Sequence, residues 1–288
     1  MKIKLLEHKH IPGFDGGSSI EYHDDNIFLT DIYSTEILVL SPKWKETARI
    51  PLFAPGSTPS PDAHRDLQAS TIVEINKIPR LLALATDGSG NGQHKAVLIN
   101  LDNKTREDFV INRFDERLKT SGLPETNITA AAVVLGRLVL ANRGNQGSSS
   151  NNFVVTDIDV WKEQDTEEIS LLPVKYPENA PEAVLITGMC YSPENDWLLL
   201  TFNSVTAVEG GEDVISYFGL VENASRKVAR KQVKINEFMA LPDVSKNFAG
   251  VAIKAIGMQS DKNGKVKTFL VSDDKKGGTR VFRIRIKH

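Results

Sequence analysis

Short apolar runs, each bounded by turn residues, recur along this chain at nearly regular intervals. Each run has the length of a strand, and Gly, Pro, Asn or Asp interrupts it too soon for a helix. When the second run of each group is aligned, the runs end at positions separated by 56, 56, 60 and 70 residues. A unit of four strands repeated at such a period is typical of a β-propeller. The aligned ends are Asp31, Asp87, Arg143, Asn203 and Asp273.

Five groups predict an all-β chain that forms one five-bladed β-propeller domain over residues 1–288. The last group has three strands, whereas residues 2–8 form a strand with no group of its own. Because an open ring would leave two blades uncovered, we expect this N-terminal strand to complete the last blade. The alternatives are a six-bladed propeller, if residues 173–181 or 203–213 contain further strands, and a sandwich or two-domain arrangement. The predicted blades are approximately 18–54, 66–112, 127–175, 183–236, and 248–288 together with 2–8.

Two details of this prediction concern the later blades. The fourth strand of the fourth blade is expected at residues 231–235, and the first strand of the fifth blade at residues 248–253. The basic cluster at residues 226–231 is interpreted as a solvated hairpin face rather than a phosphate-binding patch.

The composition limits the classes of partner. Hydrophobic residues make up 40% and charged residues 25% of the chain, and the formal net charge is -2, which is typical of a soluble globular protein. We therefore expect neither nucleic acid nor membrane as a partner, and we expect a monomer. The N-terminus lacks the apolar segment of a signal peptide, so the expected location is cytoplasmic, or exported if such a peptide has been removed. The single cysteine, Cys190, excludes internal disulfides and multi-cysteine metal sites, and its apolar neighbours indicate a buried, unreactive thiol.

A ligand site is expected at one end of the central channel. In a propeller, the loops that enter the innermost strands and the loops that leave the second strands lie on the same face. The acidic ends gathered there could hold a divalent cation such as calcium, and arginines beside them could bind a small anionic or carbohydrate-like ligand. The alternative interpretation is that short polar residues end these strands and cap tight turns. The candidate ligand-binding residues are Asp31, His64, Arg65, Asp66, Gln68, Asp87, Arg143, Asn203 and Asp273, and the loop residues expected near the axis also include Ser18, Ser19, Asn127, Thr129, Glu182 and Asn247.

No catalytic residue is identified by motif. The sequence contains no P-loop, nucleophile elbow or zinc-spaced His/Cys set. The Gly-rich segment at residues 87–92 superficially suggests a calcium loop, but Leu98 stands where an EF-hand requires Glu. His64 with Asp62 or Asp66 could form a pair of base and orienting carboxylate, although a solvated loop histidine is the simpler interpretation.

Four segments resemble the phytase-like and SdiA-regulated-like β-propellers. They are residues 65–69, 127–131, 248–252 and 269–274, the entries of inner strands and one second strand. The resemblance implies a propeller and, in its phytase-like branch, calcium-dependent hydrolysis of phosphate esters. Those families open their inner strands with Glu-Gly or Leu-Glu, whereas the matching positions here hold Gln68, Thr129 or Ala130, and Ala249. The sequence leaves open whether the protein is an enzyme, phytase-like or esterase-like, or a propeller whose loops at residues 144–152 and 206–213 bind a protein partner.

Overall fold

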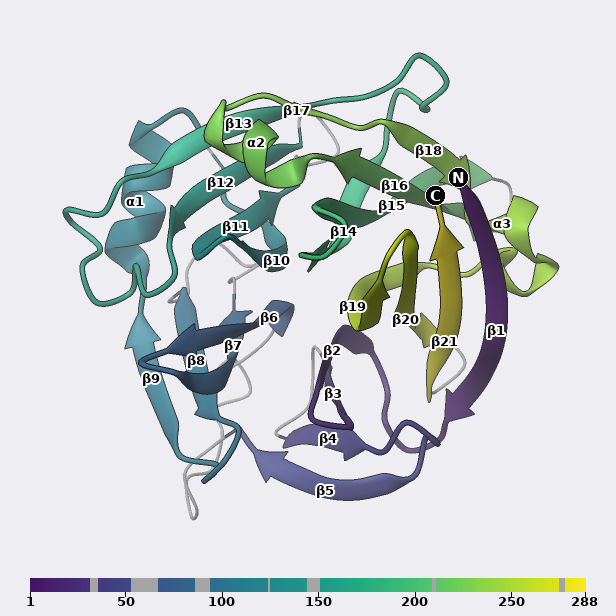
Figure 1. The fold of residues 1–288 in the computed structure, drawn as a ribbon, viewed down its shortest axis with the longest axis horizontal. Coiled ribbons are helices and arrows are strands. Elements are labelled where there is room, and N and C mark those ends of the chain that lie inside the picture. The colour runs from purple at the N-terminus through teal and green to yellow at the C-terminus, as the bar shows by residue number, and fades with distance from the viewer. Residues whose placement is uncertain are drawn as a thin grey trace.

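The computed structural model is a ring of five β-sheets around a central axis, which confirms the predicted five-bladed propeller (Figure 1). The structure describes residues 1–31, 36–52, 67–85, 94–123, 125–143, 151–208, 211–274 and 278–288. The five sheets contain every strand in these ranges, so the six-bladed alternative is wrong. Within the same ranges, no helix is both long and apolar enough to cross a membrane.

The first two blades are four-stranded antiparallel meanders, as the alternation of apolar runs and turns predicts. In each blade the first strand lies nearest the axis and the fourth lies at the rim (Figure 1). Blade one consists of β2 (Gly17–His23), β3 (Asn26–Asp31), β4 (Glu36–Leu40) and β5 (Glu46–Pro51), and blade two of β6 (Leu67–Ile75), β7 (Ile78–Ala85), β8 (Lys95–Asn100) and β9 (Arg106–Val110).

Blades three and four depart from the predicted strand order at the rim. The segment expected as the fourth strand of blade four instead forms β17 (Val233–Lys234), which pairs in parallel with β13 at the edge of blade three. The fourth strand of blade four is β18 (Glu237–Ala240), beyond the predicted boundary at residue 236. Blade three consists of β10 (Ile128–Val134), β11 (Arg137–Asn142), β12 (Asn152–Asp157), β13 (Ser170–Lys175) and β17, and blade four of β14 (Leu185–Ser192), β15 (Trp197–Val208), β16 (Gly211–Glu222) and β18.

Blade five closes the ring with a strand from the other end of the chain, as predicted. β1 (Lys2–Ile11) pairs antiparallel with β21 (Gly278–Lys287), with Ile3 opposite Ile286 and Leu5 opposite Ile284. The remaining strands of the blade are β20 (Lys265–Asp274) and the innermost β19 (Ile253–Lys262). The prediction of an innermost strand at residues 248–253 is therefore wrong, because the chain forms a 3-10 helix (Lys246–Phe248) and enters the strand at Ile253.

Three short α-helices lie outside the blades in the described part of the chain, and the sequence analysis predicted none of them. α1 (Asn112–Thr120) packs the side chains of Phe114 and Leu118 against the core between blades two and three. α2 (Ala224–Ala229) contains part of the basic cluster that was interpreted as a hairpin face. α3 (Leu241–Val244) has Pro242 in its first turn, where the amide of a residue has no hydrogen-bond acceptor within the helix.

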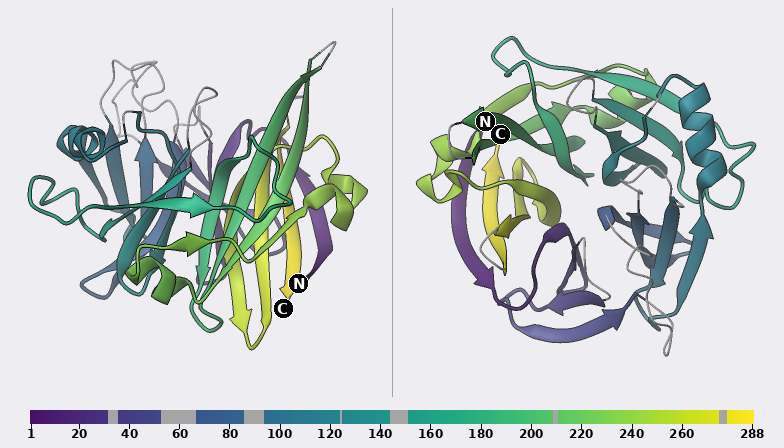
Figure 2. Two further views of the ribbon diagram at one scale, coloured as in Figure 1. Left: turned by 90° about the horizontal axis from the view of Figure 1, so that it is seen from above. Right: turned by 180° about the vertical axis from the view of Figure 1, so that it is seen from behind.

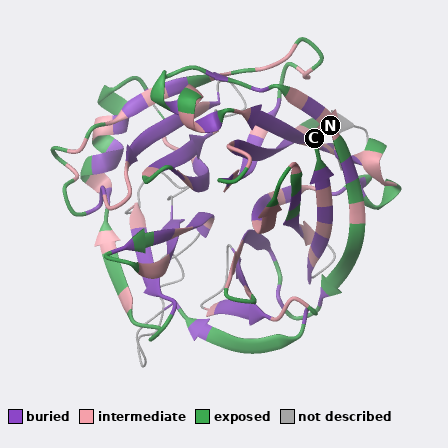
Figure 3. Cartoon of the chain, in the orientation of Figure 1, coloured by how far each residue is buried: buried purple, intermediate pink, exposed green. Residues whose placement is uncertain are grey.

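The core is divided into five apolar clusters, one between each pair of neighbouring blades. Successive side chains of a strand point to opposite faces of its sheet, so each central strand contributes to two clusters. In β11, Leu138 and Leu140 face blade two, whereas Val139 and Ala141 face blade four. The strands read as nearly continuous apolar runs because both faces are buried, and only the rim strands such as β5 are largely exposed (Figure 3).

The innermost strands approach one another closely at two glycines. A Cβ atom at Gly257 of β19 would lie 2.3 Å from the backbone oxygen of Ile20 in β2. A Cβ at Gly188 of β14 would lie 2.7 Å from Cα of Ala255 in β19. Both distances are too short for any side chain, so these positions allow the inner strands to pack around a narrow channel.

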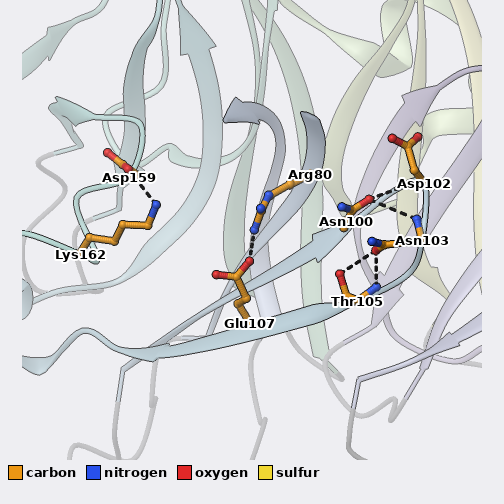
Figure 4. Close-up of polar contacts among 8 residues, drawn as sticks. All are labelled: Arg80, Asn100, Asp102, Asn103, Thr105, Glu107, Asp159 and Lys162. Carbon is orange, nitrogen blue, oxygen red and sulfur yellow. Dashed lines mark hydrogen bonds and ion pairs between the residues drawn. The ribbon is translucent and has the colours of Figure 1, made fainter. Parts of the chain in front are cut away.

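Side-chain hydrogen bonds also fix the outer turns of the blades, as Figure 4 shows for blade two. Oδ1 of Asn100 accepts hydrogen bonds from the backbone amides of Asp102 and Asn103, at 2.9 and 3.2 Å. The short polar residue thus closes the turn between β8 and β9. An ion pair joins Arg80 of β7 to Glu107 of β9 across the strand between them.

Candidate ligand site in the central channel

All five innermost strands carry a β-bulge at the same level of the channel. The ladders between first and second strands shift register at Ser18 in β2, Gln68 in β6, Thr129 in β10, Thr187 in β14 and Lys254 in β19. A bulge leaves one residue unpaired and redirects its side chain. We call these five residues the bulge ring.

The bulge ring lines a cavity at the mouth of the channel, which we call the upper cavity. Its volume is about 80 Å³, and it opens to solvent at the mouth of the channel. Gly16 and Gly17 contribute backbone, and Arg143 and Asp273 contribute charged side chains from the ends of β11 and β20. Two cations, Arg143 and Lys254, face one carboxylate, so the described lining residues carry a formal charge of +1.

Two bulge-ring hydroxyls have a defined hydrogen-bonding direction. Ser18 donates its Oγ hydrogen to the carbonyl of Leu67 in the next blade (2.6 Å), and Thr129 donates to the carbonyl of Ile186 (2.8 Å). Each carbonyl belongs to the residue just before the bulge of the neighbouring strand. Since a hydroxyl has one hydrogen, these oxygens offer a ligand only their lone pairs.

The structure brings together three of the nine candidate ligand-binding residues. Gln68, Arg143 and Asp273 line the upper cavity. Asp31 is buried at the end of β3, opposite Gly17 in the ladder. The remaining predicted residues His64, Arg65, Asp66 and Asp87 lie outside the described ranges.

Asn203 is at the predicted strand position, but its side chain serves the interface between blades four and five. Its Nδ2 donates to the carbonyl of Ile253 (3.0 Å), and its Oδ1 lies 2.6 Å from Oγ of Ser216. Asn203 is buried and is not among the residues that line the upper cavity. Of the other residues expected near the axis, Ser18 and Thr129 line the cavity, whereas Glu182 and Asn247 are exposed outside the innermost strands.

The sequence analysis did not identify Thr187 and Lys254. A usable signal was present, because every bulge-ring residue is a polar side chain followed by a small residue. Four of the five are also preceded by Leu or Ile, and the exception, Ser18, follows Gly17. Lys254 was missed because the inner strand of blade five was placed several residues too early.

Calcium, which the resemblance implies, does not fit the described part of the upper cavity. Calcium takes six to eight oxygen ligands, usually including several carboxylates. The described lining residues offer the single carboxylate of Asp273 beside two cations. Among the described residues, no group of three His, Cys, Asp or Glu side chains lies together. The predicted cation site stays a prediction, since Asp66 and Asp87 belong to it and lie outside these residues.

Comparisons with solved structures support the propeller fold. The chain is similar to a Myxococcus xanthus glutaminyl cyclase, with a TM-score of 0.55 and 10% identity over 99% of this chain and 96% of that one. It is similar to an endo-arabinase from Bacteroides thetaiotaomicron, with a TM-score of 0.56 and 11% identity over 96% of both chains. At this identity the likeness extends to the fold alone.

Comparison with family models identifies the family of the chain but not a function. None of the curated proteins compared with the chain matches it. The resemblance to phytase-like and SdiA-regulated-like propellers is not confirmed at the family level. A model of a family of unknown function matches residues 13–286, and the chain therefore belongs to that family, DUF6929.

Proposed function

We propose that this propeller binds a small anionic, hydroxylated ligand, such as a sugar acid, in the upper cavity. The observation that carries the proposal is the convergence of the five bulge-ring side chains with Arg143 at one cavity. Arg143 and Lys254 supply charged donors for a carboxylate or phosphate group. Ser18 and Thr129 supply acceptor oxygens, which suit the hydroxyl groups of the same ligand.

The test measures binding of gluconate, glucose 6-phosphate and glucose by isothermal titration calorimetry. We expect the charged ligands to bind more tightly than glucose. Removing one charged donor with Arg143→Met or Lys254→Met should cost about 1.5–3 kcal/mol, a loss of affinity of roughly ten- to a hundredfold. Lys267→Met is the matched control, because Lys267 is exposed on β20 and does not line the cavity. Equal affinity for glucose and gluconate, or unchanged affinity in both cavity variants, would contradict the proposal.

Hydrolysis of such a ligand, phytase-like or esterase-like, is a further step that the same site could support. Assaying purified protein against 4-nitrophenyl phosphate and 4-nitrophenyl acetate, with and without added calcium, tests it directly. Turnover that is lost in Asp273→Asn would favour an enzyme. Binding without turnover would leave a ligand-binding propeller.

One observation favours the second candidate, a propeller that binds a protein partner. β15 and β16 remain paired as far as Val208 and Gly211, and their hairpin stands out from the body of the ring (Figure 2). Val205 on this hairpin is exposed. Replacing residues 206–213 by Asn-Gly should preserve the melting temperature, because Val205 and Val214 are opposite each other in the ladder and a two-residue turn can join them. Loss of a cross-linked partner in that variant, with ligand binding intact, would support this candidate.

A further inference from the structure

The opposite end of the channel contains a second cavity, which we call the lower cavity. Its volume is about 150 Å³, and all five innermost strands contribute to its wall. Ser18 and Tyr22 are four residues apart on β2, so the two cavities lie about 13 Å apart along that strand. The lower cavity is therefore separate from the proposed anion site.

A narrow middle cavity of about 10 Å³ lies between the two. It shares Gln68 and Thr129 with the upper cavity, and Glu21 and Met189 with the lower one. Glu21 thus stands where the lower cavity narrows.

Glu21 is an acid in an otherwise neutral wall. The hydroxyl of Ser70 donates to its Oε1 at 3.1 Å. The other titratable side chains that line the middle and lower cavities are Tyr22, Cys190 and Tyr191, and none of them is a cation. Burial raises the pKa of Glu21 well above its usual value, and the hydrogen bond from Ser70 opposes this only in part.

The surroundings of the lower cavity are also mainly acidic. Tyr22 donates its hydroxyl hydrogen to Asp25 (2.7 Å), and Tyr191 donates to Asp196 (2.9 Å). The charged groups that act on Tyr22 are Asp24 and Asp25, in the turn after β2, and Arg283 of β21. Tyr191 is affected by Asp196, in the turn after β14, and by Asp261 of β19. The charges that act on Cys190 are those of Glu21 and Asp261.

Arg283, the one cation among these groups, is already engaged. Its guanidinium pairs with Glu7 (3.1 Å), donates to the carbonyl of Pro42, and lies over the rings of Trp44 and Phe269. It is therefore held on the side of blade five that faces blade one, and it is not among the residues that line the lower cavity. The lower cavity thus combines one enclosed carboxyl group with an apolar wall and two aromatic rings.

We propose that the lower cavity binds an organic ammonium ion, whose charged head pairs with Glu21 and whose hydrocarbon part lies against Ile72, Met189 and Met258. Aromatic rings attract such an ion, and methionine side chains adapt their shape to an irregular apolar group. A metal ion fits the wall less well, because hard cations require several oxygen ligands and Glu21 is the only carboxylate among the described residues of the lining. An anion would meet an acid, and the described part of the wall offers no cation to it.

Binding of this cation is coupled to a proton. The ammonium head stabilises the ionised form of Glu21, so at a pH below the raised pKa binding releases the proton that the free protein retains. The apparent affinity therefore rises with pH until Glu21 is ionised in the free protein.

The test uses n-butylammonium and tetramethylammonium, with 1-butanol and butyrate as neutral and anionic counterparts, at constant ionic strength. We expect the ammonium ions to raise the melting temperature of the wild-type protein, to do so more at higher pH, and to lose the effect in Glu21→Gln. Glu74→Gln is the matched control, because Glu74 is an exposed glutamate on β6. The proposal is overturned if no ammonium ion shifts the melting temperature, or if Glu21→Gln responds like the wild type.

Cys190 provides an independent readout, because it is the only cysteine and lines the same cavity. Its thiolate attacks a methanethiosulfonate reagent, forming a disulfide and releasing methanesulfinate. We divide the rate at which Cys190 reacts with the cationic aminoethyl reagent by its rate with the anionic sulfonatoethyl reagent. This ratio should exceed the ratio measured for free 2-mercaptoethanol with the same two reagents. This excess should fall at least several-fold in Glu21→Gln. A ratio unaffected by Glu21→Gln contradicts a cation site at Glu21.

Discussion

The backbone amide of Gly17 donates a hydrogen bond to Oγ1 of Thr279, which is 2.9 Å away in space and 262 positions away in the sequence. Gly17 begins the innermost strand of blade one, and Thr279 lies near the start of β21 in blade five. Both residues are buried. The bond therefore joins the first and last blades on the side where the ring closes.

We expect Thr279→Val to lower the free energy of unfolding by about 1–3 kcal/mol, because a buried amide hydrogen loses its acceptor. Thr279→Ser keeps the acceptor and removes one methyl group, which costs about 0.8 kcal/mol. Urea unfolding followed by circular dichroism measures both. A valine variant as stable as the serine variant would show that this bond does not stabilise the closed ring.

Gly257→Ala should destabilise the protein by about 1–3 kcal/mol, as expected for overpacking. The new Cβ would lie 2.3 Å from the backbone oxygen of Ile20, so β19 and β2 must separate. Gly136→Ala is the control, since a Cβ there has no neighbour within 4 Å and only its φ of +77° is unfavourable. We expect the midpoint of thermal unfolding to fall further for Gly257→Ala than for Gly136→Ala. Equal midpoints would contradict the close approach of the inner strands.

Asn203→Ala should also lower the free energy of unfolding, by about 1–3 kcal/mol for a buried hydrogen bond that is lost. The carbonyl of Ile253 loses the donor Nδ2 of Asn203, whereas the hydroxyl of Ser216 still has the carbonyl of Val251 as an acceptor, at 2.7 Å. Asn236→Ala provides a comparison, because Asn236 is exposed and water can replace it. Ligand affinity of the upper cavity should be unchanged in folded Asn203→Ala. A loss of affinity without a loss of stability would instead support the binding role predicted from the sequence.

Stability should fall with rising pH because of Glu21. A carboxyl group whose pKa is raised in the folded state binds more protons there than in the unfolded chain, so its contribution is complete below the ordinary glutamate pKa of about 4.3 and is lost as pH rises through the raised value. Glu21→Gln removes this group and should be at least as stable as the wild type at pH values above the raised pKa. The measurement is urea unfolding as a function of pH, with Glu74→Gln as the control. A wild-type profile identical to that of Glu21→Gln would contradict the raised pKa.

The ring and its closure could be predicted from the sequence because they depend on strand length, turn residues and counting. The unpaired strand around Ile3 and Leu5 had one available place beside the incomplete last group, and it lies there. Continuous apolar runs such as Leu138–Val139–Leu140 indicate strands with both faces buried, and this is a local property of the chain.

The rim and part of the site could not be predicted in the same way. The pairing of Val233 with Val174 in blade three is set by α2, which carries the chain across a blade boundary. No strand pattern encodes that crossing. Glu21 was not recognised as a channel residue, because its environment depends on Ser70 and Met189 from two other blades. The α1 helix did carry a usable signal, the spacing of four residues between Phe114 and Leu118.

The bulge ring has a consequence for how channel specificity could diverge among related chains. The ladder residues on either side of each bulge hold the blade together, so the bulged side chain can change with little effect on the sheet. One substitution per blade would then alter five contacts around a single ligand independently. In blades one and three this freedom is smaller, since Ser18 and Thr129 also join neighbouring blades through their hydroxyls. Divergence should therefore be small at these two positions, which would make two blades conservative around the axis.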